Sequence, residues 1–266
     1  MYIPTSVRKP QGNKSPGASA PKEPNVTIVD VDDILSFPER DGKGVLMNGS
    51  FVMKPNASMI QVYMTPSKSN ASFESEGDED AQQFKHKFEG EHPGNELEIA
   101  EFVQNFTGRN VIIIYGSCSD KFRKVLGSKC APLQLRPSLQ DDNDARKHLL
   151  VFEQAAATGY VPGHYLGEIV LAEPATASSG ALTIANDSVM QKLPATVSEV
   201  TVTAITADAD KVVTLIGGGG DTPAVLETSA NVLLKGGANW TAFEGAVIHF
   251  KVFEGVTKQL IELSRE

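Results

Sequence analysis

The chain has 266 residues, of which 41% are hydrophobic and 21% are charged, so it can bury a core and is not disordered throughout. Its formal net charge of −9 disfavours general electrostatic binding to nucleic acid or to an anionic membrane. Two cysteines are too few for a disulfide framework in a domain of this size.

Residues 1–25 are rich in Pro, Gly, Ser and Lys, and such a segment cannot build a core of its own. No apolar stretch follows its basic residues, so it does not resemble a secretory signal, and we expect a chain that is made in a cytosol and is soluble or assembles after synthesis. The segment is either a loose tail or an arm that docks on a neighbouring subunit. The candidate docking residues of this N-terminal arm are Tyr2, Ile3, Val7, Arg8 and Lys9.

Residues 26–171 are expected to form one β domain, because short apolar or alternating segments follow one another between turn residues. In residues 82–90, Phe84, His86 and Phe88 share one face of a strand. Later strands are predicted after the helix, with residues 138–146 as a polar loop between two of them. The predicted strands are residues 26–31, 49–54, 58–65, 71–76, 82–90, 109–115, 122–126, 132–136, 147–154 and 164–170.

One helix is predicted at residues 95–107, where apolar residues recur at a spacing near 3.6. Asn95 is the expected N-cap, and Glu96 and Glu98 favour the positive end of the helix dipole. Gly108 is expected to end the helix.

The composition changes at residues 172–181, a small and polar segment that indicates a linker. Residues 182–266 then alternate short β segments with glycine-rich turns, which predicts a small all-β domain, either an Ig-like sandwich or a barrel. The glycine run at residues 217–220 lacks the spacing of a phosphate-binding loop, so we expect a hairpin loop there.

Isolated polar residues give little indication of chemistry. The five histidines have no metal-ligand spacing, and those in strand-like segments (His86, His148 and His249) are expected to be packed or surface residues. Cys118 and Cys130 are expected to be ordinary small residues. Trp240 is expected to pack in a β core rather than to stack on a sugar. We therefore expect no catalytic residues, no metal and no cofactor.

Acidic residues gather in the segment FESEGDED, at a junction between two predicted strands. Paired carboxylates can serve acid–base catalysis or bind calcium, but a solvated loop or a negative surface is the more common role of such a cluster. The same interpretation applies to residues 141–144. The candidate residues of this acidic cluster are Glu74, Glu76, Asp78, Glu79 and Asp80.

The order of these elements resembles a known family. An acidic tip (ESEGDEDAQ) leads to an alternating strand (QFKHKFEGEHPG), a helix (NELEIAEFVQNF), a strand (GRNVIIIYGSC), a hairpin segment (KFRKVLGSKCAPLQLRPSL), an acidic loop (QDDNDARK) and a closing strand (HLLVFEQ). This pattern resembles the major tail or tail-tube proteins of bacteriophages, in the form carried by phages of Bacteroidota hosts. The resemblance covers residues 26–170, and residues 182–266 are similar to the decoration domains that such proteins carry outside the tube.

The resemblance implies a β-sandwich or barrel with a flanking helix that forms rings, commonly hexameric, which stack into a conduit for genome ejection. The implied partners are further copies of the chain and other tail or neck proteins, with DNA as passing cargo and no membrane. The implied location is the virion tail, after synthesis in the bacterial cytoplasm. The acidic cluster would line the lumen or lie at a ring interface. The alternatives are a head–tail connector or terminator, a capsid decoration protein, or, from another class, a glycan-binding adhesin; a hydrolase fits least.

Overall fold

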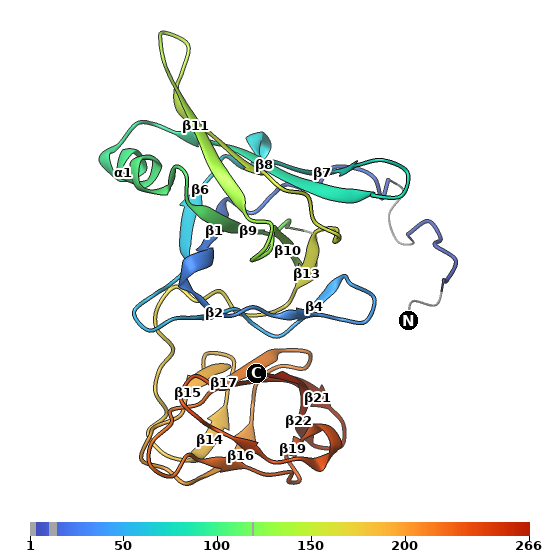
Figure 1. Cartoon of the computed structure of the whole chain (residues 1–266), viewed down its shortest axis with the longest axis vertical. Helices are drawn as coiled ribbons and strands as arrows, with labels where there is room; N and C mark the ends of the chain where they lie inside the picture. Colours follow the sequence, from blue (N-terminus) through green and yellow to red (C-terminus); the bar gives the residue numbers. More distant parts are fainter. Residues whose placement is uncertain (1–3, 11–14, 119) are drawn as a thin grey trace. The chain divides into compact units, whose positions relative to one another are not determined.

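The computed structural model describes residues 4–10, 15–118 and 120–266 (Figure 1). The chain is mainly β, with 45% of residues in strands and one α-helix among the described residues, so the expected fold class is confirmed at this level. The described part also has three short 3₁₀ turns, η1 (Val31–Asp33), η2 (Pro66–Lys68) and η3 (Lys235–Gly237). Tyr2 and Ile3 of the predicted arm lie outside the described residues.

The chain divides into two compact units that are not the two segments expected from composition. The first unit comprises Met1–Asp32, Arg40–Leu46 and Ile60–Tyr165, and the second comprises Asp33–Glu39, Met47–Met59 and Leu166–Glu266. Two segments from the N-terminal half therefore belong with the C-terminal residues. Backbone hydrogen bonds within the second unit fix them, including one from the Met59 amide to the Val170 carbonyl at 2.7 Å.

The first unit is built on an eleven-stranded sheet with the order β3-β4-β13-β10-β9-β11-β12-β8-β7, in which β1 pairs with both β9 and β6. β9 pairs antiparallel with β1, β10 and β11, and β10 pairs antiparallel with β13. The strands are β1 (Asn25–Asp30), β3 (Glu39–Arg40), β4 (Leu46–Asn48), β6 (Ile60–Tyr63), β7 (Asn70–Glu76), β8 (Gln83–Pro93), β9 (Asn110–Tyr115), β10 (Arg123–Leu126), β11 (Leu133–Asp141), β12 (Arg146–Gln154) and β13 (Gly163–Tyr165).

The sheet of the first unit curls, since the end of β10 and the middle of β8, four places apart in the strand order, come together where the Gly127 amide donates to His86 Nδ1 at 3.1 Å. The core lies on its inner face, where Phe88, Leu133 and Phe152 are fully buried. The predicted strand at residues 164–170 is shorter than expected, since β13 ends at Tyr165.

The helix α1 (Leu97–Phe106) closes one side of this core through Ile99, Phe102, Val103 and Phe106. The N-cap residue is Glu96, so the prediction of Asn95 is wrong. The Asn95 side chain instead accepts a hydrogen bond from His148 Nε2 at 2.9 Å, which occupies its oxygen. Gly108 has a φ of 84° directly after the helix, as expected of a residue that terminates it.

The second unit contains a four-stranded sheet with the order β14-β16-β18-β20 and a five-stranded sheet with the order β15-β17-β21-β22-β19, besides the pair β2-β5. From β14 to β20, each successive strand lies in the other sheet. The strands are β2 (Ile34–Ser36), β5 (Val52–Met53), β14 (Ala181–Ile184), β15 (Met190–Lys192), β16 (Glu199–Ile205), β17 (Val212–Ile216), β18 (Val225–Leu226), β19 (Val232–Leu233), β20 (Trp240–Thr241), β21 (Val247–Glu254) and β22 (Lys258–Arg265).

Parallel pairing distinguishes the second unit from an Ig-like sandwich. The pairs β14/β16, β15/β17, β16/β18 and β19/β22 are parallel, so the chain winds around its core in a solenoid-like path before the antiparallel pair β21/β22 closes it. Residues 217–220 pass from one sheet to the other, and the prediction of a hairpin loop there is wrong. Glycine is required at Gly217, Gly218 and Gly220 because a Cβ atom would collide with neighbouring backbone carbonyls.

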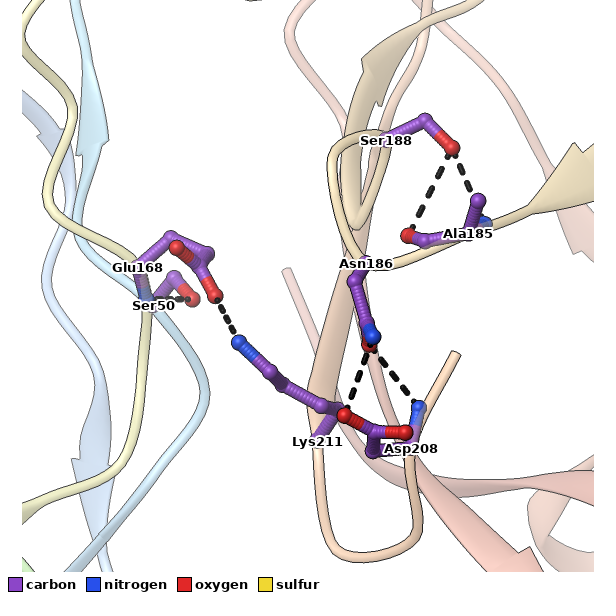
Figure 2. A network of polar contacts seen from close by, with 7 residues as sticks. All are labelled: Ser50, Glu168, Ala185, Asn186, Ser188, Asp208 and Lys211. Atoms are coloured by element: carbon purple, nitrogen blue, oxygen red, sulfur yellow. Dashed lines mark hydrogen bonds and ion pairs between the residues drawn. The ribbon is translucent and has the colours of Figure 1, made fainter. Parts of the chain in front are cut away.

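Polar contacts fix the turns of this winding (Figure 2). Asn186 and Asp208 exchange two hydrogen bonds of 2.9 Å, which join the turn after β14 to the turn after β16. The Lys211 ammonium binds Glu168 at 3.2 Å, and the Glu168 amide donates to Ser50 Oγ at 3.1 Å. The segment that contains Ser50 is thus attached to the C-terminal residues by polar contacts within the second unit.

Candidate assembly surface

The acidic cluster lies at the turn of the β7–β8 hairpin, and all five of its carboxylates are exposed. The turn is closed by a bond from the Ala81 amide to the Asp78 carbonyl at 3.0 Å. The Gln82 amide group also donates to the Gly77 and Asp78 carbonyls, at 2.7 and 3.1 Å. Gly77 has a φ of 114°, and a Cβ atom there would collide with the Ala81 carbonyl oxygen. The tip is therefore a turn fixed by hydrogen bonds, and its carboxylates are exposed to solvent.

The acidic cluster keeps its charge unpaired. No residue of the cluster has a Lys or Arg nitrogen within ion-pair distance among the described residues, whereas ion pairs form farther along β8. These pairs are Lys85 with Glu153 at 3.8 Å, Lys87 with Glu89 at 2.6 Å and Lys147 with Glu91 at 3.0 Å. A compact group of unpaired carboxylates repels anions and can attract a basic surface of another chain.

The strand that leads to this tip is the last in the sheet. β7 pairs with β8 along Asn70–Glu76 and is the terminal strand in the order given above. A terminal strand presents a row of backbone N–H and C=O groups that another strand can pair with. Phe73 on this strand is 46% exposed, and its ring meets that of Phe84 edge-on at 5.7 Å. The edge thus combines backbone pairing capacity with an exposed aromatic side chain.

A second hairpin extends beyond the sheet. β11 and β12 pair along their whole length, from Leu133↔Gln154 to Asp141↔Arg146, but β11 meets β9 only at Leu133 and Gln134, so its far end projects outward (Figure 1). The polar loop expected at residues 138–146 is therefore wrong: its flanks are strand, and only residues 142–145 turn.

Asp142 closes the second turn, because its Oδ1 accepts from the amides of Asp144 and Ala145, each at 2.9 Å. Gln140 donates to Asp142 Oδ2 at 2.9 Å. These bonds, that of Gln140 first, lower the pKa of Asp142. The turn is therefore closed by an ionised carboxylate at neutral pH.

The described part of the N-terminal arm contains no helix, and it turns at residues 15–18, where the Ala18 amide donates to the Ser15 carbonyl at 3.0 Å. Val7, Arg8 and Lys9 belong to no helix or strand and are exposed, with 95% of Val7 accessible. The end of the arm is attached: the Glu23 amide donates to the Gly116 carbonyl at 3.0 Å, and Lys22 Nζ donates to Ser117 Oγ at 3.3 Å. No hydrogen bond or ion pair joins the described arm residues Val7, Arg8 and Lys9 to the acidic cluster.

The remaining residues singled out by sequence are distributed through the two units. His86, His148 and His249 are buried in their strands, so of the two alternatives, packed or surface, the first holds. Trp240 packs in the core of the second unit with 4% exposure, which confirms the prediction for it. Cys118 and Cys130 are free and exposed. Among the described residues no group of three or more His, Cys, Asp or Glu side chains is placed to hold a metal ion.

No helix in the described part of the chain combines the length and the apolarity that a membrane crossing needs. Comparison with protein-family models, with curated proteins and with solved structures finds no match.

Proposed function

We propose that the chain is a bacteriophage virion protein, a tail-tube subunit, of which several identical copies form a ring around a channel and the rings stack. The observation that carries this proposal is the open edge of the first unit, where β7 ends the sheet and holds the acidic cluster at its tip. A strand edge that pairs with the next copy repeats around a ring and leaves no free edge when the ring closes.

Six copies per ring is the symmetry that the family resemblance implies. Carboxylates that face a channel would repel the phosphates of passing DNA, so an acidic wall would let the genome slide during ejection instead of retaining it. The arm, basic at Arg8 and Lys9, would lie on an acidic surface of a neighbouring copy. The role is mechanical, with no catalytic step and no cofactor.

The second unit would be an outer decoration domain under this proposal. An adhesin role was supported in the sequence by Trp240, but this side chain is buried and offers no exposed ring for a sugar. A head–tail connector or terminator, or a capsid decoration protein, remains the alternative within the same class of virion proteins.

Analytical ultracentrifugation of the full chain over a hundredfold range of concentration tests the proposal. We expect a ring species whose mass is a fixed multiple of 28.5 kDa, followed by larger stacks of that ring at high concentration. A ring that never stacks would favour the connector. A 28.5-kDa monomer at every concentration would contradict both.

A further inference from the structure

Three polar side chains form a row across neighbouring strands of the first unit. Lys124 on β10 lies directly opposite Tyr115 on β9 and directly opposite His164 on β13. Residues directly opposite each other in a sheet point to the same face, so the phenol, the ammonium and the imidazole lie side by side. Sequence reasoning missed this row because the three residues are far apart in the chain and only the strand register aligns them.

This row opens into a cavity of about 290 Å³ in the curled sheet. Its other walls are mainly apolar and come from β7, β10 and the segment before β13. His164 also borders a second cavity of about 530 Å³. Sites for small molecules are commonly apolar cavities of this kind with a few converging polar groups, often at the open end of a curled or closed sheet. The apolar wall residues of the first cavity include Phe73, Leu126, Val161 and Pro162.

The polar groups of the cavity are hydrogen-bond donors. Lys124 Nζ lies 2.5 Å from His164 Nε2, and because an ammonium can only donate, Nε2 accepts and the imidazole proton is on Nδ1. That Nδ1 is buried without a hydrogen-bond partner among the described residues. Burial raises the pKa of Tyr115 to about 12, so its hydroxyl keeps its proton at neutral pH.

Lys124 forms no ion pair, since no Asp or Glu oxygen of the described residues lies within ion-pair distance of it. Burial lowers its pKa, the charge of Asp120 raises it and that of Lys22 lowers it. A partly desolvated cation without an ion-paired carboxylate is costly, and a bound anion would offset that cost.

We infer that this cavity binds a small carboxylate with an apolar body, its carboxylate on Lys124 and its apolar part against Phe73 and Leu126. A cation would meet the charge of Lys124, and a neutral apolar molecule would leave that charge without a partner. A phosphate has too little apolar surface to use the walls. This inference goes beyond the proposed function and does not depend on it.

Isothermal titration of the full chain with octanoate tests the inference. We expect one saturable site per chain. Lys124→Met should bind octanoate about tenfold more weakly than the native chain. Lys129→Met, which replaces an exposed lysine in the turn after β10, is the control and should bind octanoate as the native chain does. Octan-1-ol, with the same chain and no charge, should bind more weakly than octanoate. Absence of saturable binding, or equal binding by Lys124→Met and the native chain, would overturn the inference.

A second readout uses the native chain and does not depend on the variant folding. Trinitrobenzenesulfonate modifies accessible amines, and the modified lysines can be located by peptide mass spectrometry. Octanoate should slow the modification of Lys124 several-fold and leave that of Lys129 unchanged. Equal rates at Lys124 with and without octanoate would overturn the inference as well.

Discussion

At the scale of residues, His86 shows how one side chain joins distant parts of the first unit. Its Nδ1 accepts from the Gly127 amide at 3.1 Å, and its Nε2 donates to the Tyr160 carbonyl at 2.9 Å. Its own amide donates to Gln154 Oε1 at 2.7 Å. A neutral imidazole satisfies both bonds, whereas a protonated one would place a second N–H against the Gly127 amide.

His249 has a similar role in the second unit. It is buried beneath Gly49, where a Cβ atom would collide with the ring, and its Nδ1 lies 3.0 Å from Thr214 Oγ1. Burial is the main cause that lowers the pKa of both histidines to about 4. The sequence predicted that these histidines are either packed or surface strand residues; their partners come from other strands, so local alternation could not decide between the two.

Stability should therefore fall in mild acid. Because the folded pKa of both histidines is below the ordinary value of 6.5, their contribution is complete above pH 6.5 and is lost as pH falls towards 4. Each pH unit below 6.5 lowers the free energy of unfolding by about 1.4 kcal/mol per histidine, so at pH 5 each histidine has lost about 2 kcal/mol of its contribution. Urea unfolding at pH 7.5 and pH 5 measures it, and a free energy of unfolding equal at both would contradict the assignment of neutral histidines.

At the scale of elements, the strands of the first unit were predicted well because their apolar alternation is local. The errors lie where contacts from elsewhere decide the structure. Residues 138–141 are polar except for Leu139, and they form strand because β12 pairs with them. Residues 217–220 cross between sheets because β17 pairs in parallel with β15 and β18 pairs in parallel with β16. The Asn95 cap failed because His148, from another strand, binds its oxygen.

The β7–β8 turn should depend on Gly77. Gly77→Ala places a side chain at a φ of 114° and against the Ala81 carbonyl, which should lower the free energy of unfolding by about 1–3 kcal/mol. Gly159→Ala is the matched control, because that glycine has no positive φ and nothing within 4 Å of its Cβ position. Chemical denaturation of both variants measures the difference, and equal stabilities would show that the turn is not constrained as described.

At the scale of the whole molecule, the division into two units is non-local. Composition suggested a boundary at residues 172–181, but part of that segment pairs with β15, since the Ala177 amide donates to the Lys192 carbonyl at 2.8 Å. Met47–Met59 joins the second unit although nothing in its own sequence distinguishes it from the strands around it. Val52 packs there with Ile216 and Val247.

Val52 should therefore stabilise the second unit. Val52→Ala removes buried methyl groups, so the protection of β17 and β21 amides against hydrogen exchange should fall by the equivalent of about 1–3 kcal/mol, while that of β9 in the first unit stays unchanged. Val256→Ala, which alters a fully exposed valine, is the control and should change the amide protection of neither unit. Loss of protection in β9 alone would contradict the assignment of Met47–Met59 to the second unit.

The acidic cluster, the open edge of β7 and the basic arm acquire a common role only if copies of the chain assemble. Among the described residues, β7 pairs only with β8, and Val7, Arg8 and Lys9 lie in no strand. Negative-stain electron microscopy of the purified full chain at high concentration tests this most directly. The proposal predicts hollow tubes of stacked rings with a channel wide enough for duplex DNA, about 20 Å. Single particles of monomer size at every concentration would contradict it.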